Sequence, residues 1–263
     1  MQNLKSFLDI QEYTYNNINF IANDPISIPH LFNKKEDIEI AAFLTALISW
    51  GNRTAIIKSA RHLMELMDFS PFAFVLKASD DELERVSTFY YRTFNADDLL
   101  FLISALRNIY KNKGGLERAA EIGFNKNGMI KDSILNIRKE LLENPHLLRT
   151  EKHLANPEKG SAAKRINMFL RWMVRKDNKG VDFGLWKNIP SSALMCPLDV
   201  HSGRVARQLG LLTRKQNDWN AVEELTASLR KLDNDDPIKY DFALFGMGIS
   251  GQNLSNLNNV LDK

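Results

Sequence analysis

The sequence predicts an all-α protein of about ten helices. Apolar residues recur at helical spacing almost throughout, and no segment alternates apolar and polar residues as a half-buried strand does. Chain-breaking residues are also scarce, since Gly and Pro make up about 8% of the sequence where ordinary globular proteins carry roughly 12%. This scarcity disfavours an all-β sandwich or barrel.

The first half of the chain predicts one buried helix followed by amphipathic ones. The run from Asp37 to about Ser49 is apolar on nearly every side, which is typical of a helix enclosed by its domain. Ser70-Pro71 has the pattern of an N-cap followed by proline, and Ser79 to Glu82 fits a capping box. Amphipathic helices are expected over residues 56–67, 97–111, 116–124 and 131–143.

The second half continues in the same way around one long interruption. Helices are expected over residues 162–174, 203–212 and 221–232, and a last one begins near Asp236-Pro237. Residues 176–197 form a loop or linker that contains Gly180, Gly184, Pro190 and Pro197.

Composition excludes several classes of protein. With 44% hydrophobic and 25% charged residues, the chain has the composition of a globular protein. Its longest apolar stretches contain about a dozen residues and fall short of the roughly 20 that cross a bilayer. The N-terminus lacks the pattern of a secretory signal, so we expect a cytoplasmic protein. The single cysteine, Cys196, excludes an internal disulfide, an all-cysteine zinc site and a four-cysteine iron–sulfur cluster, and we expect neither metal nor cofactor.

Positive charge is concentrated in one segment. Residues 164–215 hold eleven Lys or Arg against three Asp, whereas the whole chain has a net charge of +3. Such a segment either contacts a phosphate backbone or forms a solvated basic face, and charge alone does not separate the two.

Asp199 stands directly before a predicted helix. The simplest role for this residue is an N-cap, whose carboxylate accepts hydrogen bonds from the free amides of the first turn. A catalytic role is compatible with capping, because backbone donors favour the ionised carboxylate and a fixed anion stabilises a cation that develops on a substrate.

The run from Asp199 to Leu212 resembles a signature of the helix-hairpin-helix DNA glycosylase superfamily, Val-Asp-Thr-His-Val, Arg-Val, Arg-Leu-Gly-Leu, in which the Asp is catalytic. The matching residues are Asp199, His201, Arg204-Val205, Arg207, Leu209 and Gly210. Gly160-Ser-Ala-Ala-Lys164-Arg165 is similar to the end of the hairpin motif, with Lys164 on the catalytic lysine. Residues 43–54 look like the family's helix end that enters the minor groove, and the Asp241–Gly248 stretch is similar to its last helix.

The chain also departs from the family pattern. Ala162 replaces the second glycine of the hairpin, and no Leu-Pro precedes Gly160. The interval from Lys164 to Asp199 is longer than in the endonuclease III branch and closer to the archaeal 8-oxoguanine glycosylases, and the cluster-binding cysteines are missing. The chain is therefore identified as a member of a separate bacterial branch. The resemblance implies one glycosylase-like unit over residues 1–263 with two lobes and a cleft between them, the lobes being about residues 37–150 and the N- and C-terminal remainder.

The resemblance implies that the protein flips a damaged base out of double-stranded DNA. Asn52 and Arg53 are candidates to fill the gap, whereas Trp50 fits a core aromatic better. Gly160, Arg165, His201 and Arg204 are further candidates for DNA contact, with His201 structural or in a supporting position. Arg207 either faces a phosphate or pairs with an acidic residue of the core.

The resemblance implies a monomeric glycosylase with lyase activity that removes an oxidised purine. Asp199 would stabilise the sugar cation, and the amine of Lys164 would attack the anomeric carbon to give a Schiff base. Spacing alone favours a surface lysine in the first turn of a helix, and it is the resemblance that favours the catalytic role of Lys164. Two alternatives stay open: a DNA-binding or lesion-sensing protein without catalysis on the same scaffold, and a helical protein with an unrelated partner.

Overall fold

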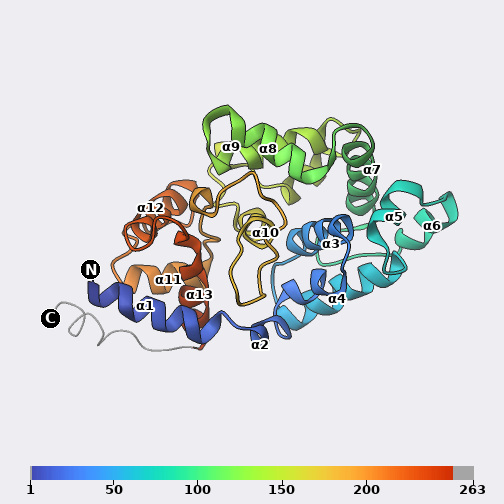
Figure 1. Cartoon of the computed structure of the whole chain (residues 1–263). Coiled ribbons are helices and arrows are strands. Elements are labelled where there is room, and N and C mark those ends of the chain that lie inside the picture. The colour runs from blue at the N-terminus through green and yellow to red at the C-terminus, as the bar shows by residue number, and fades with distance from the viewer. Residues whose placement is uncertain (1, 251–263) are drawn as a thin grey trace. The chain divides into compact units, whose positions relative to one another are not determined.

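The computed structural model describes residues 2–250, and every regular element among them is a helix (Figure 1). No strand occurs in this part of the chain, where two isolated β-bridges link single residues. The all-α prediction is therefore confirmed for these residues. None of their helices combines the length and the apolar character that a membrane span requires.

The chain divides into two compact units. One unit is formed by Ile21–Asn156, and the other combines the segment up to Phe20 with the chain from Pro157 onward. A short helix, α2 (Ile18–Ile21), lies at the boundary. The Ile21–Asn156 unit contains α3 (Lys35–Leu47), α4 (Arg53–Leu66), α5 (Pro71–Lys77), α6 (Asp80–Val86), α7 (Ala96–Asn112), α8 (Gly115–Asn127) and α9 (Ile130–Leu142), with 3₁₀ helices at Pro25–Ser27, Pro29–Leu31 and Leu148–His153.

Helix α3 forms the centre of the Ile21–Asn156 unit. Each of its residues from Ile38 to Leu47 is buried, because α4, α5 and the 3₁₀ helices of residues 25–31 pack around it. The prediction of an enclosed helix is confirmed. The capping box at Ser79 is confirmed too, since its side chain accepts from the Glu82 amide and Glu82 binds the Ser79 amide in return.

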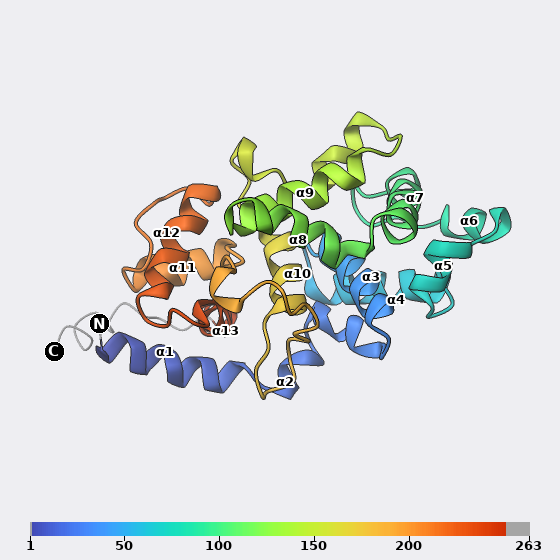
Figure 2. The same ribbon diagram turned by 45° about the horizontal axis from the view of Figure 1, so that its top comes forward.

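The other unit is built around α13 (Tyr240–Ser250). Both α1 (Gln2–Tyr15) and α11 (Val200–Gln208) pack on this helix (Figures 1 and 2). Gly246 allows the approach of α1, since a Cβ atom there would lie 2.2 Å from Cγ of Tyr15. The remaining elements are α10 (Lys164–Val174), α12 (Trp219–Arg230) and 3₁₀ helices at Pro157–Lys159, Ser191–Ala193 and Pro237–Lys239.

The loop of residues 176–197 folds back onto α10. The Phe183 amide donates to the carbonyl of Trp172 (2.9 Å), and the Trp186 amide donates to that of Met173 (2.9 Å). The buried Trp186 indole packs edge-to-face on Phe169, with ring centroids 5.4 Å apart. The loop is therefore part of the core of its unit.

Helix boundaries differ from the predicted ones where a cap decides them. The helix predicted from residue 203 begins at Val200, since Asp199 caps it. The helix predicted from residue 162 begins at Lys164, because Ala163 has a left-handed conformation (φ +50°) that cannot belong to an α-helix. Helix α1 has no counterpart among the predicted helices.

Candidate active site at the start of helices α10 and α11

A tight turn delivers Lys164 to the first position of α10. Gly160 has φ +83°, a conformation that glycine adopts without strain, and its carbonyl accepts from the Trp219 amide (3.1 Å). The Ala163 amide donates to the Ser161 hydroxyl (3.2 Å). The element that precedes this turn is the short 3₁₀ helix Pro157–Lys159. The Gly160 segment is thus a 3₁₀–turn–α arrangement.

Asp199 is held rigidly at the start of α11. Its Oδ1 atom accepts hydrogen bonds from the amides of His201 (2.8 Å) and Ser202 (2.9 Å). In return, the Asp199 amide donates a hydrogen bond to the Ser202 hydroxyl (3.0 Å). The Asn217 side chain donates to the Asp199 carbonyl (3.0 Å). The predicted N-cap role is confirmed, and it leaves Oδ2 available for another partner.

That partner is Lys164. Its Nζ atom lies 3.7 Å from Oδ2 of Asp199, and the two side chains are 27% and 21% exposed. The same ammonium group lies 5.8 Å from the centre of the Phe245 ring, which belongs to α13. The two helix starts thus place an amine and a carboxylate side by side, partly shielded from water yet accessible to a ligand.

A third titratable group, the buried carboxyl of Asp241, lies near enough for the charges of Asp199 and Lys164 to act on it. Burial raises the pKa of its carboxyl group to about 6. The negative charge of Asp199 adds to this rise, and the Arg171 guanidinium opposes it. The thiol of Cys196 lies 4.0 Å from Oδ1 of Asp241. Burial, with the nearby Asp241, raises the pKa of that thiol well above its usual value, so Cys196 is a neutral buried group.

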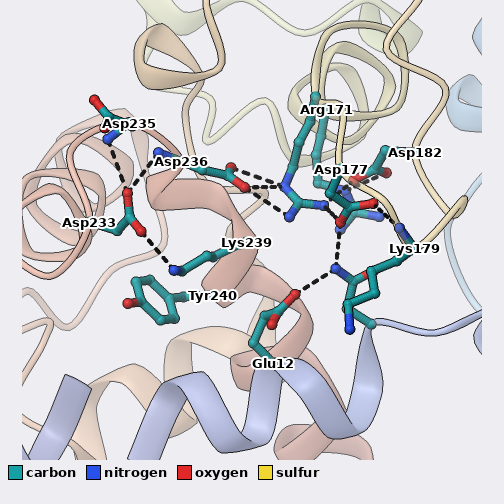
Figure 3. Close-up of polar contacts among 12 residues, drawn as sticks. Glu12, Arg171, Asp177, Lys179, Asp182, Asp233, Asp235, Asp236, Lys239 and Tyr240 are labelled. Carbon is teal, nitrogen blue, oxygen red and sulfur yellow. Dashed lines mark hydrogen bonds and ion pairs between the residues drawn. The ribbon is translucent and has the colours of Figure 1, made fainter. Parts of the chain in front are cut away.

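Two arginines of the basic segment are buried in ion pairs and do not belong to its surface. Arg171 bridges Asp241 and Asp182, and Arg175 contacts Asp182 (3.0 Å), Asp236 and Asp177. Figure 3 shows Arg171, Asp177, Asp182 and Asp236 gathered in this network. Burial lowers the pKa of Arg175, but its ion pairs with Asp182 and Asp236 outweigh burial and raise it above the usual value. The exposed bases of the segment are Lys176, Lys187, Arg204 and Lys215.

The other predicted contact residues of this unit lie beside the pair on α10 and α11. His201 and Arg204 are exposed, and Arg204 donates to the Gly248 carbonyl (2.9 Å). Burial lowers the pKa of Arg165 to about 10. Arg207 donates to the carbonyl of Arg214 and to Asn217. The structure therefore does not pair Arg207 with an acidic side chain of the core.

Asn52 and Arg53 belong to the Ile21–Asn156 unit. Asn52 caps α4 by accepting from the Ala55 amide (3.1 Å) and is exposed, and Arg53 follows it as the first helical residue. Trp50 stacks on the buried ring of His153, with centroids 5.8 Å apart, and packs edge-to-face on Tyr91. The interpretation of Trp50 as a packed aromatic residue fits these contacts.

The sequence patterns assign no role in the site to Asp241, Arg171 or Phe245, although Asp241 and Phe245 lie in the stretch that resembles the family's last helix. Arg171 did leave a signal, because it interrupts an otherwise apolar run from Met168 to Val174 and a buried cation requires a partner. The identity of that partner depends on a contact across 70 residues of chain. Within residues 2–250, His, Cys, Asp and Glu side chains form no group of three suited to a metal ion.

One comparison with known proteins finds a match. A family model described as "Protein of unknown function (DUF2400)" matches residues 24–250, from before α3 to the end of α13. The chain belongs to this family. No curated protein and no solved structure matches the chain. The matched residues of the DUF2400 family include Lys164, Asp199 and Asp241, whereas α1 precedes the match.

Proposed function

We propose that this DUF2400 protein is a DNA glycosylase with lyase activity that removes an oxidised purine from double-stranded DNA. The observation that carries the proposal is the pairing of Lys164 Nζ with Oδ2 of a helix-capping aspartate, Asp199, at 3.7 Å. An amine beside a fixed carboxylate is the arrangement that covalent cleavage of an N-glycosidic bond requires. The resemblance of both segments to the helix-hairpin-helix glycosylases supports the same activity.

Asp199 acts on the sugar. As the bond between C1′ and the base lengthens, positive charge develops on C1′ and the ring oxygen, and the carboxylate stabilises that charge electrostatically. Two backbone amides hold Oδ1 in place, so Oδ2 does not have to reorganise during the reaction. Such pre-organisation is the largest contribution that a fixed anion makes to catalysis.

Lys164 acts as the nucleophile in its neutral form. Its lone pair forms the Nζ–C1′ bond while the bond from C1′ to the base breaks, the electron pair leaves with the base, and the proton that Nζ then loses neutralises the base. Opening of the sugar ring, with a proton from water to the ring oxygen, gives the protonated Schiff base. Loss of a C2′ proton then expels the 3′ phosphate by β-elimination, which cuts the strand, and water releases Lys164.

The DNA partner would meet a basic and partly exposed surface. On this unit, His201 and Arg204 follow Asp199 on α11, and Arg165 follows Lys164 on α10. Asn52 and Arg53, at the exposed start of α4 in the other unit, are the residues proposed to fill the space of the flipped base. In the cell, such a protein works on the nucleoid.

Trapping with borohydride tests the proposal. Incubation of the protein with a duplex that contains 8-oxoguanine, in the presence of borohydride, should give a covalent complex and release the free base. Lys164→Gln should abolish the complex, and the exposed Lys215→Gln should leave it unchanged. Equal trapping by Lys164→Gln would remove this lysine from the mechanism.

A second candidate function is a DNA-binding or lesion-sensing protein without catalysis. The segment before Lys164 favours it, because a one-turn 3₁₀ helix and Ala162 stand where the superfamily has a complete hairpin. Such a protein would bind damaged duplex with a strong dependence on salt and would release no base. Absence of any DNA binding would contradict both candidates.

A further inference from the structure

We propose that Asn217, in the loop between α11 and α12, is a positioning residue for the Lys164–Asp199 pair. Its side chain binds the backbone of Asp199, and the two residues that follow it bind the turn before Lys164. One short segment, residues 217–219, thereby holds both helix starts. This inference rests on the proposed function, because it concerns how the same site is held in place.

The first contact of this segment is with Asp199. The Asn217 side-chain amide donates to the Asp199 carbonyl (3.0 Å), which also accepts the first hydrogen bond of α11, from the Gly203 amide (2.9 Å). A carboxylate is fixed only as firmly as the backbone that carries it. The bond from Asn217 therefore restrains the residue that presents Oδ2 to Lys164.

The second contact is with the turn that leads into α10. Asp218 forms an antiparallel bridge with Ser161. The Trp219 amide donates to the Gly160 carbonyl (3.1 Å). Trp219 is the first residue of α12 and is buried, so this end of the segment is anchored in the core of its unit. The turn and Asp199 are thus fastened to one anchored segment, which sets where the lysine and the aspartate stand.

Arg207 holds the Asn217 side chain in the required orientation. Its Nη2 atom donates to Oδ1 of Asn217 (2.7 Å), which leaves the amide nitrogen for the Asp199 carbonyl. Its Nε atom donates to the carbonyl of Arg214 in the same loop (2.8 Å). Asparagine suits this position, because its side chain accepts at one atom and donates at the other. Arg207 therefore acts through Asn217, in place of a phosphate contact or an acidic partner.

Gly203 makes room for these two side chains. It lies inside α11, where alanine would favour the helix more than glycine does. A Cβ atom at this position would lie 2.9 Å from Nη1 of Arg207 and 3.0 Å from Oδ1 of Asn217. The glycine thus lets Arg207 and Asn217 cross the first turn of α11 and reach the Asp199 backbone.

The test measures DNA affinity and the single-turnover rate of base release at saturating protein, on duplex that contains 8-oxoguanine. Asn217→Asp keeps the size of the side chain and its contact with Arg207, but a carboxylate has no donor for the Asp199 carbonyl. Loss of one hydrogen bond should lower the saturating rate about three- to tenfold, at the Kd of the control. Asn220→Asp is the matched control: it adds the same charge at an exposed position in the first turn of α12 and should keep the rate of the unaltered protein.

The role of Arg207 is tested in combination with Asn217→Ala. If Arg207 acts through Asn217, Arg207→Ala should lower the saturating rate on its own and change it little in the Asn217→Ala background. A phosphate contact predicts weaker binding with a smaller dependence on salt, and rate effects that multiply. Asn217→Ala also replaces Asn217→Asp if the latter does not fold. A folded Asn217 variant that is less stable but keeps the saturating rate would show a purely structural role and overturn the inference.

Hydrogen exchange of the His201 and Ser202 amides, followed by NMR, does not depend on catalysis. Both amides donate to Oδ1 of Asp199, so their protection reports how firmly that residue is held. Exchange should be about three- to tenfold faster in Asn217→Ala, while the Ala221 amide, which Asp218 caps, should keep its rate. If the unaltered protein releases no base, the proposed function fails and exchange alone decides the inference. Unchanged protection of both amides would overturn it.

Discussion

Lys164 and Asp199 lie on opposite sides of the 176–197 loop in the chain, yet Nζ of one is 3.7 Å from Oδ2 of the other. Each residue stands at the start of a helix, Lys164 as the first residue of α10 and Asp199 as the cap of α11. The loop between them packs back on α10 and carries Asp182 into the arginine network. The same loop that separates the two residues in the chain thus helps to organise the site below them.

Substitution of Asp199 should separate its capping role from its charge. Asn is as good an N-cap as Asp, so Asp199→Asn should lower the free energy of unfolding by less than about 0.5 kcal/mol, whereas Asp199→Ala should lower it by about 1 kcal/mol. Both variants lose the anion and should lose base release. Denaturant unfolding and a base-release assay check this; full activity in Asp199→Asn would show that the charge is not needed.

Gly246 should be required for the packing of α1. In Gly246→Ala the new methyl group meets the ring of Tyr15, and such overpacking costs about 1 to 3 kcal/mol. In combination with Tyr15→Ala, the cost of Gly246→Ala should fall, since the obstructing ring is gone. A double-mutant cycle on unfolding free energies measures this coupling, and simple additivity would contradict the contact.

The buried Asp241 should make the protein less stable as the pH rises. Its pKa of about 6 in the folded protein is above the value in the unfolded chain, so the folded state binds the extra proton between about pH 4 and pH 6. Stability from this group is present below that range and is lost through it, at a cost on the order of 3 kcal/mol above it. As the pH rises through this range, the free energy of unfolding of Asp241→Asn should increase relative to that of the unaltered protein. A difference between the two proteins that does not change with pH would mean that Asp241 stays ionised in the folded protein.

Arg204 should contribute to DNA affinity through the phosphate backbone. Arg204→Ala should weaken binding to any duplex and reduce the slope of log affinity against log salt by about 1. Arg85→Ala is the control, because Arg85 is a surface residue of the other unit that pairs with Asp68. Fluorescence anisotropy at several salt concentrations measures both, and an equal slope in the two variants would exclude Arg204 from the interface.

The helices that the sequence predicted well are those whose signals are local. The enclosed run of α3 and the box at Ser79 depend on neighbouring residues only, and both agree with the structure. Helix α1 is different, because Leu8 is its only buried residue and its position depends on Gly246 in α13. A helix whose packing depends on a glycine far along the chain cannot be predicted from its local sequence pattern.

The candidate site shows the same division. The resemblance of two segments pointed to Lys164 and Asp199, and the cap of α11 follows from residues 199–202. The ion pairs of Arg171 with Asp182 and Asp241 could not be predicted from the sequence, because folding brings these residues together from distant segments. A count of charges along the chain placed Arg171 and Arg175 on a basic face, whereas burial and ion pairing remove both from it.

The most direct test of the central claim is to locate the covalent bond. After trapping on 8-oxoguanine duplex with borohydride, nuclease and protease digestion followed by mass spectrometry should find the reduced sugar remnant on the peptide that contains Lys164, bound to its Nζ atom. We expect this attachment at Lys164 and its loss in Lys164→Gln. A remnant on another lysine or on the N-terminal amine, or no adduct under conditions in which a known lyase is trapped, would contradict it.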